Sequence, residues 1–146
     1  MPTSEIQQSP LIHALELILC CMQANAPSVA QSLQPGLTRE QIEAQLQRLP
    51  FRLPEEVYQL YQWRNGSVPE AQVDFLPQYR ILSLEEAIGE WQSVYDLERE
   101  ICESLVGDPR QESIDLNNFD WLPLFAEASN YYVISGDIAV ISLVLR

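Results

Sequence analysis

The sequence contains no lysine, and all eight of its basic residues are arginines. Against them stand 21 acidic residues, so the 146-residue chain has a formal net charge of −13. Without lysine there is no Gly-Lys-Ser/Thr phosphate-binding loop, and the five glycines are scattered singly. An acidic surface repels nucleic-acid phosphates and anionic lipids, so the composition argues against nucleic acid or a membrane as the partner. It favours a basic protein partner, which the field would attract and steer.

Histidine and cysteine are also scarce. His13 is the only histidine, so a Ser–His or Cys–His catalytic pair would have to use it, and it lies in an apolar helical pattern near no nucleophile motif. The sequence also lacks the ligands of a typical zinc site, because it has one histidine and no C-x-x-C pair. Cys20, Cys21 and Cys102 are an odd set with one adjacent pair, which suits a reducing compartment better than a disulfide framework. We predict no catalytic residues, no metal and no cofactor.

Long apolar runs are missing. The longest apolar stretch, residues 11–22, includes His13 and Glu16 and is too short to span a bilayer. Glu5 precedes it and no base does, unlike the start of a secretory signal peptide. We therefore expect a cytoplasmic protein. The length and the 47% hydrophobic and 20% charged composition suit a single globular unit.

Local patterns predict an α+β fold with a mainly antiparallel sheet packed against helices. Capping residues and prolines predict helices over residues 10–24, 27–34, 39–49, 54–64 and 84–106. Strand patterns cover residues 79–82, 121–126, 131–134 and 138–145. In the last helix we expect the apolar stripe to face inward as far as Leu97, Ile101 and Leu105, with the acids facing water.

One segment is more informative than the composition. Residues 53–66, LPEEVYQLYQWRNG, open with Leu-Pro and close with Asn-Gly. This segment resembles the signature of the SUKH superfamily, which includes the yeast cell-wall-synthesis regulator and many bacterial immunity proteins. Further pieces resemble that family in the same order, at residues 38–46, 79–87 and 121–126. The resemblance implies an α+β, non-catalytic protein-recognition domain.

The residues of the resemblance also have structural explanations. Pro54 suits the first turn of a helix, and Asn65-Gly66 suits a helix stop with a left-handed residue. Trp63 and Trp121 are expected to be core aromatics. The set to which we assign a structural role is Leu53, Pro54, Trp63, Asn65, Gly66 and Trp121.

The resemblance also divides the chain into an N-terminal helical extension, residues 1–36, and a SUKH-like domain, residues 37–146. The first helix is apolar on most sides and has to be covered, either by this domain or across a homodimer. Because it lies outside the family-like part, we favour the homodimer. The expected contacts are Leu11, Leu15, Ile18, Leu19 and Met22.

The negative charge is concentrated in the second half of the chain. Residues 85–137 hold 13 acids and two arginines, a net charge of −11, against −2 for residues 1–50. We predict that a partner docks there. The predicted contact residues are the acids Glu85, Glu86, Glu90, Asp115, Asp120 and Glu127 and the apolar anchors Phe75 and Phe119.

Three functions are compatible with this sequence. The first is an immunity-type protein that binds and blocks a cognate basic toxin. The second is a regulatory scaffold or adaptor in cell-wall or stress signalling. The third is a carboxylate-based hydrolase, which the many acids allow by number, although amphipathic helix faces account for them better. A solubilising surface is the simplest alternative for the charge itself.

Overall fold

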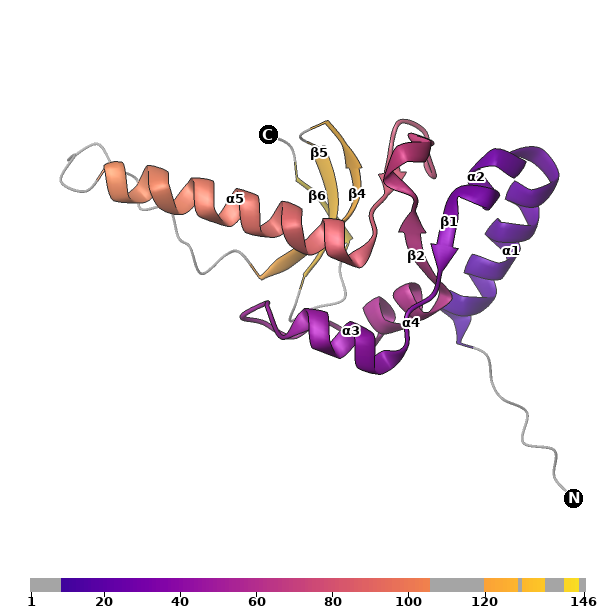
Figure 1. The fold of residues 1–146 in the computed structure, drawn as a ribbon, viewed down its shortest axis with the longest axis horizontal. Coiled ribbons are helices and arrows are strands. Elements are labelled where there is room, and N and C mark those ends of the chain that lie inside the picture. Colours follow the sequence, from indigo (N-terminus) through magenta and orange to yellow (C-terminus); the bar gives the residue numbers. More distant parts are fainter. Residues whose placement is uncertain (1–8, 106–119, 129, 136–140, 145–146) are drawn as a thin grey trace, which may run out of the picture.

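The computed structural model describes residues 9–105, 120–128, 130–135 and 141–144, with side chains up to residue 135. The described chain forms an α+β fold with antiparallel sheets, as predicted (Figure 1). The elements are α1 (Pro10–Asn25), α2 (Pro27–Ser32), β1 (Leu33–Pro35), α3 (Arg39–Leu46), α4 (Glu55–Trp63), β2 (Arg64–Ser67), a 3-10 helix (Pro69–Ala71), β3 (Arg80–Ile81), α5 (Leu84–Ser104), β4 (Trp121–Glu127), β5 (Asn130–Ser135) and β6 (Ile141–Val144). Within the described residues, no helix is long and apolar enough to cross a membrane.

The helix starts follow from local hydrogen bonding. At α1 the Ser9 hydroxyl accepts a hydrogen bond from the Ile12 N–H at 3.1 Å, and Pro10 occupies the first turn, where no N–H is needed. At α3 the Thr38 hydroxyl accepts from the Gln41 N–H, and the Gln41 side chain accepts from the Thr38 N–H. Both starts are confirmed where the capping residues predicted them.

The larger sheet has the strand order β3-β4-β5-β6, and β1 pairs with β2 in a separate two-stranded sheet. Because successive strand residues point to opposite faces, Tyr131 and Val133 share one face of β5, and Tyr132 and Ile134 share the other. The Tyr131 hydroxyl donates to the Glu90 carboxylate of α5, so α5 lies over the first face. On the second face, Ile134 lines a cavity shared with α1 and α4.

Helix α1 joins the main hydrophobic core. Leu15 and Leu19 are each 6% exposed and belong to the same buried cluster as the residues of α4, α5 and the sheet. Leu11 and Met22 pack partly against that cluster, whereas Ile18 is 40% exposed. The rest of the chain therefore covers the face of α1 that carries Leu15 and Leu19, and Leu17 and Ile18 stay exposed. A homodimer through this helix stays a prediction, as does the division of the chain at residue 36.

Two local predictions differ from the structure. Helix α4 ends at Trp63, and Asn65 and Gly66 lie in strand β2 instead of stopping the helix. Gly66 has φ of +64°, the left-handed conformation that was expected of it. Residues 33–35 form strand β1, although they were expected to end the second helix or follow it. This strand has too few residues for an alternating pattern, and its pairing with β2 is what defines it.

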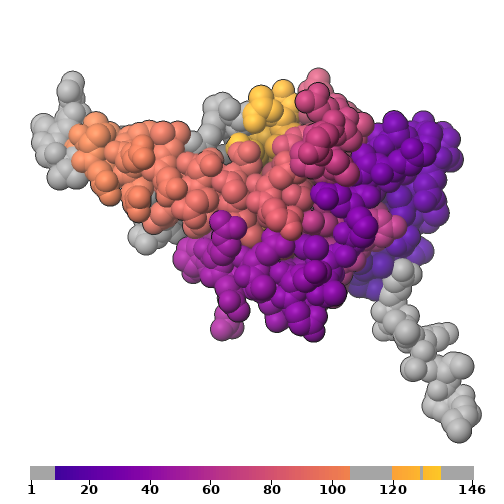
Figure 2. Space-filling view, in the orientation of Figure 1, coloured from indigo at the N-terminus to yellow at the C-terminus, as the bar shows by residue number. Residues whose placement is uncertain are grey.

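The prediction that the apolar stripe of α5 faces inward along its whole length is wrong. Val94 is 9% exposed, but Leu97 is 51% exposed and Ile101 and Leu105 are each 37% exposed. Figure 1 shows the reason: α5 extends past the strands, on the side of the molecule away from α1. Figure 2 shows the same part of the helix as a projection from the body of the protein.

Candidate functional site

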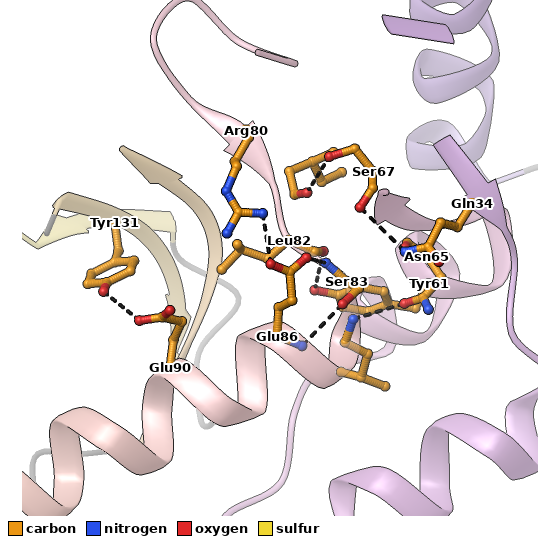
Figure 3. Close-up of polar contacts among 12 residues, drawn as sticks. Gln34, Tyr61, Asn65, Ser67, Arg80, Leu82, Ser83, Glu86, Glu90 and Tyr131 are labelled. Atoms are coloured by element: carbon orange, nitrogen blue, oxygen red, sulfur yellow. Dashed lines mark hydrogen bonds and ion pairs between the residues drawn. The ribbon is translucent and has the colours of Figure 1, made fainter. Parts of the chain in front are cut away.

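The side chain of Asn65 joins the signature segment to the start of α5 (Figure 3). Its Oδ1 accepts a hydrogen bond from the Leu84 N–H at 2.9 Å, and its Nδ2 donates to Glu85 Oε2 at 3.1 Å. The first N–H groups of a helix have no partner within the helix, so an acceptor supplied from elsewhere stabilises the start. A residue 19 positions earlier in the chain thus caps α5.

The backbone of Gly66 packs directly against the backbone that leads into α5. A Cβ atom on this residue would lie 2.4 Å from the Leu82 carbonyl carbon and 2.4 Å from the Ser83 amide nitrogen. The Tyr61 hydroxyl donates to the Leu82 carbonyl oxygen at 3.3 Å, and burial raises the pKa of Tyr61 so that the hydroxyl keeps its proton. Signature residues therefore fix the position of the segment before α5.

Glu86 completes the attachment of α5. The Ser83 hydroxyl accepts from the Glu86 N–H at 3.1 Å, and one Glu86 oxygen accepts from the Ser83 N–H at 3.4 Å, and together these bonds form a capping box. The other Glu86 oxygen lies 2.8 Å from Arg80 Nη1. Both carboxylate oxygens of this predicted partner-binding residue are therefore engaged within the fold.

Glu85 is likewise held by its neighbours. It accepts hydrogen bonds from Asn65 Nδ2 and, at 2.8 Å, from Gln45 Nε2 of α3. Partial burial of the carboxylate acts to raise its pKa, but hydrogen bonds, that of Asn65 first, outweigh the burial and lower the pKa below the ordinary value of 4.5. The carboxylate of Glu85 thus links the signature segment, α3 and α5.

Further along α5, Glu90 accepts a hydrogen bond from the Tyr131 hydroxyl at 2.8 Å, which ties the helix to β5. Three of the acids predicted to contact a partner, Glu85, Glu86 and Glu90, thus share one structural role, because each of them attaches the proximal half of α5 to the rest of the fold. Whether they also touch a partner stays a prediction.

Phe75 is a core residue and not an accessible apolar anchor. It is 9% exposed, and its ring stacks on Phe125 with centroids 5.9 Å apart and meets Trp63 edge-on at 6.4 Å. An aromatic side chain in a loop cannot be assigned to the surface or the core from its neighbours in sequence, because contacts with distant residues, here Trp63 and Phe125, decide where it lies.

The other predicted contact residues are spread over the second half of the chain. Asp120 is half-buried just before β4. Glu127 ends β4 and accepts a hydrogen bond from Asn130 Nδ2 at 3.0 Å, across the turn to β5. Asp115 and Phe119 lie outside the described residues.

The remaining signature residues are placed as follows. Leu53 and Pro54 are half-buried, and Pro54 occupies the N-cap position of α4, one residue before the helix begins. Trp63 is 5% exposed at the end of α4. Trp121 is half-buried at the start of β4. None of these positions carries a group with an obvious chemical activity.

Sequence reasoning missed the exposed surface of the distal segment of α5, which is the end of the helix with its C-cap residue, residues 97–105. Its exposed apolar residues, Leu97, Ile101 and Leu105, follow the buried Val94 at spacings of three and four. This spacing was visible in the sequence, but it was interpreted as an inward face. The length of the helix could have indicated this surface, because a helix much longer than the strands extends beyond the sheet. Helix α5 has 21 residues, whereas the strands of the larger sheet that the structure describes have two to seven.

No arrangement typical of catalysis is apparent in the described part of the chain. His13 is exposed on α1, and no three His, Cys, Asp or Glu side chains among the described residues lie close enough to hold a metal ion. A cavity of about 450 Å³ lies between α3 and the residues before α4. A smaller one of about 210 Å³, between α1, α4 and the sheet, is lined by apolar side chains and Glu56.

These contacts define an α+β domain in which a Leu-Pro…Asn-Gly segment fixes the start of one long helix. Residues 36–142 match the profile of the SMI1/KNR4 family (SUKH-1). The match covers well over half of the chain, so the protein belongs to this family, as the resemblance implied. A search of the curated proteins finds no match to it.

Proposed function

We propose that this chain is a non-catalytic protein-binding domain whose partner is a basic protein, and that the partner is a cognate toxin which it neutralises. The observation that supports this most directly is the distribution of charge, with a net −11 between residues 85 and 137. Membership of the SMI1/KNR4 family (SUKH-1) is consistent with an immunity-type or a regulatory domain.

The charge suits a basic partner in two ways. It accelerates encounter with a cationic surface and slows encounter with anionic ones. Many toxins act on nucleic acid and are basic, and a dense row of carboxylates can take the place that phosphates occupy on such a surface. Helix α5 alone carries seven acids and one arginine. Binding by occlusion then needs no chemistry from the domain itself.

We also propose that the protein works in the cytoplasm. Cys20, Cys21 and Cys102 are all free, and the first two are exposed on α1. Exposed free thiols persist in a reducing compartment. A regulatory scaffold with a non-toxin partner would share the same domain and charge, so the identity of the partner separates the two functions.

The experiment has two steps. Tagged protein is used to capture partners from its native host, and the product of any gene adjacent to its own is co-expressed with it and assayed for toxicity. We expect capture of a basic protein whose toxicity the chain suppresses. Suppression of no neighbouring toxin, together with capture of a basic housekeeping protein, would favour the scaffold.

The charge contribution is then measured with the captured protein. The on-rate should fall as salt rises beyond about 0.15 M, where the Debye length is near 8 Å. A Glu98→Gln/Glu100→Gln variant should associate more slowly, and the control Glu40→Gln/Glu70→Gln, with its changes outside the acidic segment, should associate like the wild type. A neutral or acidic partner, or an on-rate indifferent to salt, would reduce the acidic segment to a device for solubility.

A further inference from the structure

The distal segment of α5 carries an apolar stripe that the described core leaves uncovered. Leu97, Ile101 and Leu105 are spaced four residues apart and are 51%, 37% and 37% exposed. At 1.5 Å per residue the stripe is about 12 Å long, a little over two helical turns. Val94, three residues before Leu97, is only 9% exposed, and Tyr95 packs partly against the core, so the exposed stripe begins at Leu97.

Acidic side chains border the stripe along one edge. At 3.6 residues per turn, Asp96 and Glu100 fall on the same border, one turn apart. Arg99 falls on the back of the helix, where its Nε lies 3.9 Å from Glu103 Oε1. The surface is therefore aliphatic in the middle and negative along this edge.

We infer that the distal segment of α5 is the surface on which the partner docks, and that the partner presents an amphipathic helix with aliphatic residues along its centre and basic residues along the border that meets the acidic edge. Helices that pack side by side in this way bury an apolar seam and pair opposite charges at its edges. The inference rests on the proposed function and gives it a surface and a partner chemistry.

A second copy of the chain fits this surface poorly. Two distal segments packed against each other would bring together two helices that each carry seven acids and one arginine, and like charges disfavour association. The exposed apolar residues of α1, Leu17 and Ile18, differ in this respect, because Glu16 is the one acid of that helix. They provide a control: exposed apolar side chains of the same kind on another helix, which has far less negative charge.

The test uses full-length protein and a synthetic 18-residue peptide of leucine and lysine, with leucines at helical spacings of three and four. A peptide of the same composition in scrambled order is the control ligand. At about 0.15 M salt, Leu97→Gln/Ile101→Gln should weaken binding of the patterned peptide by roughly tenfold or more, since the desolvated centre of an interface carries most of its energy. Leu17→Gln/Ile18→Gln should leave it unchanged. Equal weakening by both variants, or equal binding of both peptides, would overturn the inference.

Thermal melts of the same variants give a second readout. If the stripe is free for a partner, Leu97→Gln/Ile101→Gln should melt within a few degrees of the wild type. A large drop would show that the chain covers the stripe itself, which would also overturn the inference.

The captured partner of the proposed function separates the two proposals. If it binds the Leu97→Gln/Ile101→Gln variant as tightly as the wild type, the proposed surface is wrong and the proposed function stands. If the patterned peptide responds as expected but no basic partner exists, the function fails alone.

Discussion

Replacing Gly66 by alanine should destabilise the protein by about 3 kcal/mol, because two independent penalties act at this position. Its φ of +64° lies in the left-handed region, which costs a residue with a Cβ about 1–2 kcal/mol. The new methyl group would also lie 2.4 Å from backbone atoms of Leu82 and Ser83, so β2 and the start of α5 would have to separate. That separation weakens the Asn65–Leu84 hydrogen bond, which is worth about 1 kcal/mol.

The measurement is thermal or urea unfolding, followed by circular dichroism. For a chain of this size, about 3 kcal/mol corresponds to a fall in Tm of roughly 6–12 °C. Gly89→Ala is the matched control, because a Cβ there meets nothing within 4 Å and the residue lies inside α5. This second variant should gain about 0.5–1 kcal/mol, as expected when alanine replaces glycine in a helix. If both variants shift Tm in the same direction by similar amounts, the close approach of Gly66 to the start of α5 is wrong.

Two further predictions concern the same attachment. Asn65→Ala should lower the free energy of unfolding by about 1–2 kcal/mol in urea melts, since the Leu84 N–H loses its acceptor and Glu85 a donor; an unchanged midpoint would contradict the capping role. Because the pKa of Glu85 is lowered in the folded state, unfolding takes up a proton below pH 4.5, and the stabilisation present above that pH is lost as the pH falls through the folded pKa. Glu85→Gln should reduce the dependence of the free energy of unfolding on pH in that acidic range. If the dependence stays as steep as in the wild type, groups other than Glu85 cause the acid sensitivity.

Features that depend on neighbouring residues in the sequence were predictable. The starts of α1, α3 and α5 follow from Ser9, Thr38 and Ser83, because each cap is a contact over three residues. The conformation of Gly66 was also predictable, since few other residues adopt positive φ readily. The α+β fold class also followed from local patterns, and the structure confirms it. The resemblance to the SUKH superfamily is confirmed by the profile match.

Features that depend on distant contacts were not predictable in the same way. Asn65 looked like the end of a helix, yet its side chain caps a helix that begins 19 residues later. Phe75 lies in the core because of the aromatic rings that surround it, among them Phe125. Periodicity gave the apolar face of α5 but not the point where the core ends, because that point depends on the extent of the sheet beneath the helix. The placement of Leu97 was wrong for this reason.

The proximal half of α5 is held by contacts with the rest of the fold and the distal half is exposed, and this difference affects how such a domain can evolve. Substitutions in the proximal half disturb contacts to the signature segment, to Arg80 or to Tyr131, and selection for folding removes them. Substitutions at Leu97, Ile101 or Glu100 alter a surface that the described core does not need, so they change stability little. The helix can thus diversify its outer end while its inner end stays constant. A lineage under pressure to follow a changing partner could acquire new specificities by single substitutions, without first gaining stability to offset them.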